Sequence, residues 1–174
     1  MKPFANAAAC LLLSIPGVTQ IAVTDSTQTA ALPRVELTAS RGPRNIEDLT
    51  RKKILHDYAA AWRTLDTGLE QNRAELLDDY FTGFAKHEFA QSIKAQAGTG
   101  IHRRHVDHGH KLEVLFYSPD GGVMQLRDNT EYEVQIFDGD RLLHSERMKV
   151  RFLVLMTPAA DRWMVRILQS VPAT

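Results

Sequence analysis

The chain has 174 residues, which suits one domain of ordinary size and a tail. Its 21 basic and 21 acidic residues balance, so no net field attracts nucleic acid or an anionic membrane surface. With 44% hydrophobic residues, no internal repeat and no long low-complexity run, the composition is that of a folded globular domain.

The N-terminal residues differ from the rest of the chain. Lys2 precedes an uncharged, mostly apolar run over residues 5–18. This run is too short to span a bilayer as a helix, but it has the length of the hydrophobic part of a secretory signal. We therefore expect residues 1–31 to be a signal peptide and the protein to be exported, to a periplasm or outside the cell. The alternative is a disordered or weakly membrane-associated N-terminus. If the chain is not cleaved, we expect it to contact a membrane only through this N-terminus.

Cys10 is the single cysteine. Residues 7–10 loosely resemble a lipoprotein acylation box, although little apolar sequence precedes them. If the signal is removed, the mature chain has no thiol and no disulfide, so its core alone must stabilise it. The following residues are rich in Thr, Ser, Ala and Pro, which predicts a linker over 32–44 and a folded domain over 45–174.

Apolar residues recur at helical spacing after Asn45, a candidate N-cap. One stripe with steps of three and four predicts a helix over about 46–71; it consists of Leu55, Tyr58, Trp62, Leu65 and Leu69. Shorter helices are predicted over about 73–81 and 84–96. Tyr58 and Trp62 could line a ligand pocket, but aromatic residues at this spacing more often fill a core.

From about Lys111 the apolar residues alternate with a period of two. Four strands are predicted, over about 111–118, 123–137, 141–156 and 162–171, separated by turns rich in Gly, Asp and Pro. The predicted fold class is therefore α+β, with N-terminal helices packed on a curved four-stranded antiparallel sheet. The second and third strands are long enough to curl.

The alternation also predicts which residues face the helices. Even-numbered residues of the second and third strands and odd-numbered residues of the fourth are expected to point inward. In this register Tyr132 lies opposite Glu146, Val134 opposite His144, and Met156 opposite Trp163. For the first strand we expect Leu112, Val114 and Phe116 to point inward.

A long amphipathic helix, shorter helices and then a meander of long strands resembles the nuclear transport factor 2-like fold, an α+β cone, with the cystatin-like arrangement as a looser neighbour. The resemblance covers about residues 46–172 and depends on the order of elements, because no signature motif is present. It implies a curved sheet that encloses a cone with a mouth. The superfamily includes steroid isomerases, polyketide cyclases, dehydratases, transport factors and non-catalytic accessory domains, so the resemblance implies a shape more than a function.

Polar residues interrupt the inward face at Asp128, Thr130, His144 and Glu146. In enzymes of the resembled superfamily an acid or a His in the cone moves a proton. If the chain is an enzyme, Asp128, His144 and Glu146 are its candidate catalytic residues, because burial raises a carboxyl pKa towards the range that acid–base work needs. The alternative places His144 and Glu146 on a wetted strand end and a bulge at Asp128.

A ligand pocket in the cone would combine those polar residues with aromatic ones. Its expected lining is Tyr58, Trp62, Asp128, Tyr132, His144 and Glu146.

Four histidines cluster at His102, His105, His108 and His110. On a strand, His108 and His110 would share a face like paired imidazole ligands. Gly109 between them and the absence of cysteine argue against a metal site, and a solvated loop between helix and sheet is the commoner reading. We expect no metal and no cofactor. No aromatic residues alternate with the nearby arginines, so no nucleic-acid binding is expected.

The outward face is mostly charged but becomes apolar near the last hairpin, at Leu153, Leu155, Met164 and Leu168. Such a patch predicts an interface, here a homodimer through the outer sheet face, or a surface covered by the linker residues Val35 and Leu37. The predicted function is an exported, non-catalytic domain that binds an unidentified protein partner or small ligand. The alternative is a small isomerase or dehydratase-like enzyme acting on an apolar molecule.

Overall fold

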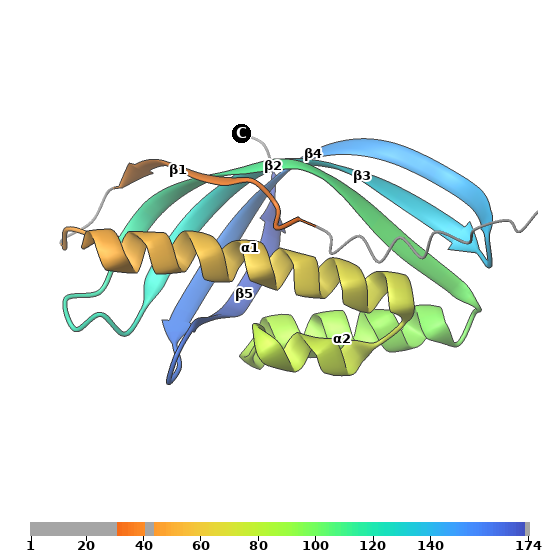
Figure 1. Ribbon diagram of the computed structural model, residues 1–174, viewed down its shortest axis with the longest axis horizontal. Coiled ribbons are helices and arrows are strands. Elements are labelled where there is room, and N and C mark those ends of the chain that lie inside the picture. Colours follow the sequence, from red (N-terminus) through yellow and green to blue (C-terminus); the bar gives the residue numbers. More distant parts are fainter. Residues whose placement is uncertain (1–30, 41–43, 173–174) are drawn as a thin grey trace, which may run out of the picture.

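The computed structural model describes residues 31–40 and 44–172 (Figure 1). The expected signal peptide lies outside these residues except for Ala31, and so does Cys10. No helix within the described ranges is long and apolar enough to cross a membrane.

Eight elements follow one another along the described residues: β1 (Val35–Ser40), α1 (Asp48–Gln71), η1 (Ala74–Asp79), α2 (Gly83–Ala97), β2 (Ile101–Tyr117), β3 (Met124–Asp138), β4 (Arg141–Pro158) and β5 (Trp163–Val171). The strands form one sheet in the order β1-β2-β3-β4-β5. Neighbouring strands are antiparallel except β1, which is parallel to β2. The predicted α+β class is confirmed, but the sheet is mixed and five-stranded.

The fifth strand comes from residues predicted as a linker. In β1, Val35 pairs with His110 and Leu37 with Leu112, and the side chains of Val35 and Leu37 pack against the core. A parallel pairing over such a sequence distance leaves no local pattern, which is why residues 32–44 resembled a linker. The two apolar residues therefore lie at the β2 edge of the sheet and do not cover the apolar patch near β5.

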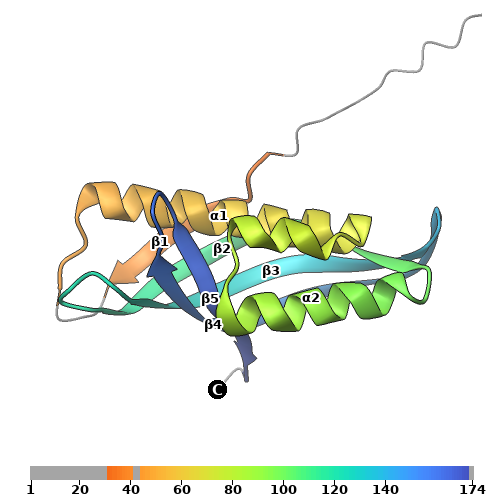
Figure 2. The same ribbon diagram turned by 90° about the horizontal axis from the view of Figure 1, so that it is seen from below.

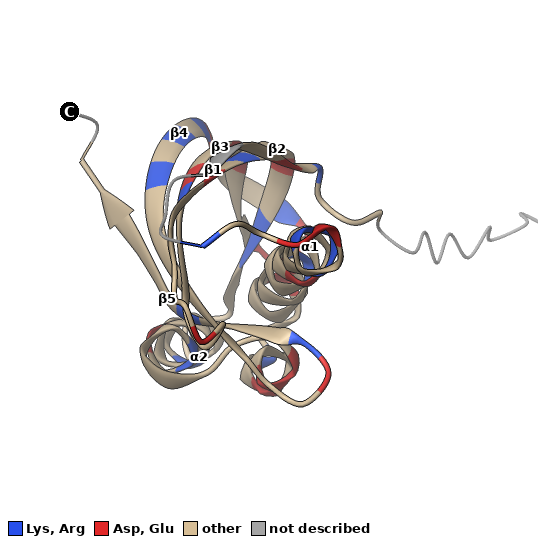
Figure 3. Ribbon diagram, turned by 90° about the vertical axis from the view of Figure 1, so that its left-hand side faces the viewer, with Lys and Arg blue, Asp and Glu red and all other residues tan. Residues whose placement is uncertain are grey.

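The long helix α1 forms where helical periodicity predicted it. Tyr58, Trp62, Leu65 and Leu69 are buried along one stripe, and Asn72 ends the helix in the left-handed conformation at φ 56°. Glu47 precedes the first turn, so Asn45 is not the N-cap. Both long helices lie on the inner side of the curved sheet, as Figures 2 and 3 show from two further directions.

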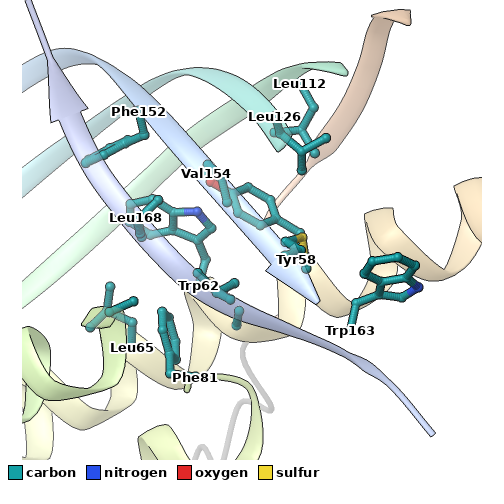
Figure 4. Packing of buried hydrophobic residues seen from close by; sticks show 14 of the residues in the cluster. Tyr58, Trp62, Leu65, Phe81, Leu112, Leu126, Phe152, Val154, Trp163 and Leu168 are labelled. Atoms are coloured by element: carbon teal, nitrogen blue, oxygen red, sulfur yellow. The ribbon is translucent and has the colours of Figure 1, made fainter. Parts of the chain in front are cut away.

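The core lies between α1 and the middle of the sheet. Figure 4 shows Tyr58 and Trp62 of α1 pointing towards Phe152, Val154 and the last strand. Asp57, only 2% exposed, fastens the helix to the start of β5, because its Oδ2 accepts the Trp163 backbone N–H at 2.7 Å. The domain is therefore stabilised by one continuous apolar cluster with a few buried polar contacts.

The inward parity of β3 and β4 is confirmed, since the buried residues there are the even-numbered ones. The pairing is displaced by two residues from the prediction: Tyr132 lies opposite Met148, and Val134 opposite Glu146. A register shift beside Ile136 accommodates the tighter turn at Gly139, which has φ 56°. A displacement of two keeps every side chain on its predicted face.

Two further register shifts move side chains to the opposite face of the sheet from the one predicted. Between Leu155 and Met156 the pairing with β5 shifts, so that Leu168 is 8% exposed and belongs to the core. Near the end of β2 a second shift turns Phe116 outward, at 38% exposed, and brings Tyr117 inward. The predictions for Leu168 and Phe116 were therefore wrong, because a bulge reverses the alternation that they assumed.

Candidate functional site

A bulge in β2 builds the polar part of the interior. The pairing with β3 shifts between Asp107, opposite Tyr132, and His110, opposite Thr130. Gly109 lies in this bulge at φ 122°, a conformation that side chains other than Gly rarely adopt. The shift points both Asp107 and His110 inward.

Asp128 of β3 is the centre of a buried cluster. Its Oδ2 accepts hydrogen bonds from the Tyr58 hydroxyl at 2.8 Å and from His110 Nδ1 at 2.7 Å. Asp128 and Tyr58 are fully buried, and His110 is 2% exposed. The other ring nitrogen of His110 lies 2.9 Å from Asp107 Oδ1, close enough for an ion pair but off the direction of a hydrogen bond.

This environment decides which groups carry charge. Burial lowers the pKa of His110, but the hydrogen bond to Asp128 and the close charges of Asp107 and Asp128 outweigh burial and raise this pKa to about 9. Burial and the charge of Asp128 raise the pKa of Tyr58 well above its ordinary value. At neutral pH the cluster therefore holds an imidazolium and a neutral phenol, and both donate to Asp128.

Aromatic rings close around the imidazolium. The ring centroid of Trp62 lies 4.6 Å from that of His110, and Tyr58 meets the same ring edge-on at 5.8 Å. Trp62 also contacts Tyr132 and Phe152 at 5.9 and 5.6 Å. A cation enclosed by aromatic faces and a carboxylate is well stabilised, and little space remains beside it.

A second contact between a histidine and an aspartate lies beside this cluster. His105 Nδ1 lies 2.9 Å from Asp66 Oδ1, and its ring packs against Tyr132 at 5.0 Å. The two side chains are 11% and 22% exposed. Burial raises the pKa of Asp66, against the opposing effect of His105. This pair lies between α1 and β2. It is connected to the buried cluster through Tyr132, which also contacts Trp62.

The predicted pocket residues separate into two groups. Tyr58, Trp62, Asp128 and Tyr132 do come together in the interior. His144 and Glu146 point to the inward side but are 55% and 63% exposed, because none of the described helices covers that end of β4. The alternative of a wetted strand end is therefore the correct one for these two residues, and they take no part in the buried cluster.

The histidine cluster does not act as one unit. Its residues lie on a strand, not in a loop, and the bulge sends His108 outward while His110 points inward, so the prediction of a shared face was wrong. His102 stacks on Phe137 at 5.1 Å. Among the described residues no three His, Cys, Asp or Glu side chains are placed to hold a metal ion. Sequence reasoning missed His110 as the partner of Asp128, although a Gly inside a strand is the usual sign of a bulge.

The outer face of the sheet carries a hollow of about 610 Å³, called the outer groove below. Its lining comes from β1 to β4 and consists of Arg34, Glu36, His108, Gly109, His110, Lys111, Asn129, Thr130, Glu131, Lys149, Val150 and Arg151. Figure 3 shows bands of Lys and Arg residues on β4, the last strand of this lining. The lining contains four Lys or Arg residues and two Glu residues, so the groove carries a net positive charge.

The acidic residues of the groove are paired with its cations. Arg34 contacts Glu36 at 2.5 Å, and Lys149 contacts Glu131 at 3.7 Å. A smaller hollow of about 150 Å³ lies between α1 and η1. Asp128 lines neither of these two hollows.

The apolar patch predicted on the outer face is present, but it is half-buried and one of its four residues differs. Leu153, Leu155 and Met164 are half-buried there, and Ile167, opposite Leu155, takes the place expected for Leu168.

No protein-family model matches the sequence, and neither does any curated protein. Among solved structures, the chain is similar to the intermembrane space region of the chloroplast protein ARC6, with a TM-score of 0.62 and 10% identity over 75% of this chain and 100% of that one. Weaker similarities include a putative scytalone dehydratase from Novosphingobium aromaticivorans (TM-score 0.48, 9% identity, 72% and 89% covered). Another is a protein of unknown function with a cystatin-like fold from Nostoc punctiforme (TM-score 0.43, 14% identity, 73% and 93% covered). The similarity to the ARC6 region shows a shared fold, and the order of elements is the one expected of the nuclear transport factor 2-like (cystatin-like) α+β cone.

Proposed function

We propose that this chain is an exported, non-catalytic binding domain and that its ligand site is the outer groove. The observation that carries this proposal is that the larger hollow lies on the outer face of the sheet and not beside Asp128. The outer groove measures about 610 Å³, within the range of small-molecule sites, whereas aromatic rings pack directly against the polar cluster of the interior.

The packing of the interior supports a structural role for its charges. A substrate would have to lie within hydrogen-bond reach of Asp128 or His110. Those positions are taken by Tyr58 and Trp62, and Asp128 Oδ2 already accepts hydrogen bonds from Tyr58 and His110. The buried cluster then fixes the orientation of α1 on the sheet.

The charges of the outer groove favour an anionic ligand. Asn129 lies between Lys111 of β2 and Arg151 of β4. Lys149 lies opposite Glu131, and Arg34 lies at one end of the groove beside β1. Lys149 is 80% exposed and Arg34 is 83% exposed, so each can turn towards a carboxylate or phosphate. Because these charges are exposed, salt would weaken the attraction strongly.

Citrate, a small carboxylate with several negative charges, is a suitable probe, with calorimetry at low and at moderate salt as the measurement. We expect binding that Lys149→Glu weakens at least about tenfold, since it converts an attraction at close range into a repulsion. Lys94→Glu, on the exposed surface of α2, changes the net charge equally and serves as the matched control. Equal weakening by both variants, or no citrate binding at low salt, would count against the groove.

Export is supported by the apolar N-terminal run alone. Intact mass of the protein purified from its own producing cell tests this part. We expect a chain that lacks about the first 31 residues; a full-length chain would contradict it.

A second candidate function has its own supporting observation. Asp128 Oδ1 and the Trp62 indole N–H are buried without a hydrogen-bond partner in the described part of the chain, and such groups often mark a site that awaits a ligand or water. If Trp62 moved aside, His110 would serve as a general acid beside Asp128 as base. That pairing suits isomerisation or dehydration of a small apolar carbonyl compound.

The enzymatic candidate is tested with a β-hydroxy ketone, whose dehydration is followed by absorbance of the enone. A real site would lose at least about 100-fold in rate with His110→Gln while circular dichroism stays unchanged. Absence of turnover in the natural sequence would remove this candidate. His144→Ala, on the wetted strand end, is the matched control and should leave any turnover unchanged.

A further inference from the structure

One half of β4 has a neighbour on only one side. The strand pairs with β3 along its length, but β5 pairs only with Arg151–Pro158. Among the described residues no strand lies beside the free side of 141–150, and residues 141–147 are exposed. Figure 1 shows the β3–β4 hairpin, with β2 beside it, extending beyond β1 and β5. A free edge presents unpaired N–H and C=O groups in strand geometry.

We propose that this edge pairs with the same edge of a second copy of the chain, antiparallel, about a twofold axis through Ser145. The inward face then becomes complementary to itself. His144 lies opposite Glu146 of the second copy, and Leu142 lies opposite Met148 of the second copy. Each relation occurs twice, because the twofold axis makes the interface isologous.

Other registers on the same face match poorly. An axis at His144 sets two imidazoles against each other and Leu142 against Glu146. An axis at Glu146 sets two carboxylates against each other, which is destabilising. Shifts by one residue would place inward side chains beside outward ones and break the continuous sheet. The axis at Ser145 alone pairs opposite charges and apolar side chains together.

The ends of the proposed pairing bring cations together, since Arg141 lies opposite Lys149 of the second copy. Both already hold an acidic partner: Arg141 contacts Asp138 at 2.9 Å, and Lys149 contacts Glu131 at 3.7 Å. The repulsion is therefore reduced. Within one copy, His144 and Glu146 are 3.5 Å apart at the limit of contact, so both remain available to the second copy.

The first test uses a disulfide, because only a residue on the axis lies opposite itself. Directly opposite residues of antiparallel strands are close enough for a disulfide. In the full chain carrying Cys10→Ser, we expect Ser145→Cys to form a covalent dimer under mild oxidation. Arg147→Cys, which lies opposite Leu143 of the second copy, is the matched control and should form little covalent dimer. Equal cross-linking of the two, or none at Ser145→Cys, would overturn the proposed register.

The second test exchanges the charges across the axis and follows dimerisation by sedimentation velocity over a concentration series. His144→Glu or Glu146→Lys alone should weaken the dimer at least about tenfold, and the double variant should restore it, because opposite charges again face each other. His87→Glu and Glu88→Lys on exposed α2 are the matched controls. A chain that is monomeric throughout would overturn the proposal. So would a dimer that ignores these exchanges and dissociates with Leu155→Glu, which would favour the outer sheet face as the interface.

Discussion

The buried His110 makes the stability of the domain depend on pH above neutrality. Its pKa is raised from 6.5 to about 9 by Asp107 and Asp128, against the opposing effect of burial. A group whose folded pKa is raised stabilises the fold fully below its unfolded pKa, and the effect is lost as pH rises through the folded pKa. The free energy of unfolding should therefore fall between about pH 6.5 and pH 9.

The size of this fall follows from the shift. A rise of about 2.5 pKa units corresponds to about 3 kcal/mol, since each unit is worth about 1.36 kcal/mol. Solvent does not screen this interaction appreciably, because the His110 side chain is only 1% exposed. The Tyr58 hydroxyl does not interfere in this window, since its own pKa is raised well above 10.

Urea unfolding at several pH values measures the effect. The matched control is the double variant His110→Gln with Asp128→Asn, because His110→Gln alone would leave the Asp128 carboxylate buried without its cation. Between about pH 6.5 and pH 9 the natural sequence should lose about 3 kcal/mol more than the double variant. A difference below about 0.5 kcal/mol would refute the buried ion pair.

Three further substitutions test the contacts around the site. Asp57→Ala removes the acceptor of the Trp163 N–H and should lower the free energy of unfolding by about 1–3 kcal/mol in urea; an unchanged value would show that this contact does not hold the helix to β5. Tyr58→Phe removes one donor to Asp128 and should cost about 1–2 kcal/mol by the same measurement, and a stabilised variant would contradict the hydrogen bond. Gly109→Ala forces a side chain into φ 122°, so we expect a loss of about 1–3 kcal/mol and an imidazole pKa nearer 6.5 by NMR; a normal bulge, with both values unchanged, would argue against the need for Gly.

Local periodicity predicted those parts of the fold that local periodicity controls. The stripe of Tyr58, Trp62 and Leu65 in α1 and the even-numbered inward residues of β3 and β4 follow from repeats of 3.6 and 2 residues, which persist wherever the backbone is regular. The meander order followed from Gly and Pro turns. These features required no knowledge of distant contacts.

The rest depends on irregular or long-range structure. β1 could not be predicted, because its parallel pairing joins Val35 to His110 across most of the domain. The bulge beside Gly109 reverses the alternation within β2, and this reversal brings His110 to Asp128 while sending His108 outward. A regular strand, the assumption behind the predicted histidine pair, would have left Asp128 without its main partner.

The exposure of His144 and Glu146 also could not be predicted from the alternation of apolar residues. Alternation states which face a residue occupies, but not how far the helices reach beneath that face. The helices do not cover the distal part of β4, so inward residues there are wetted and the interior cluster is confined to the middle of the sheet.

The most direct test of a binding domain with an outer groove is an NMR titration of the ¹⁵N-labelled chain with citrate. The indole N–H of Trp62 reports on the interior, and the backbone amides of Lys111, Asn129 and Lys149 report on the groove. Our account predicts that the three groove amides shift with a common saturation curve, while the Trp62 signal does not move. A titration that shifts Trp62 and leaves those amides in place would contradict it, and would make the cluster around Asp128 the binding site.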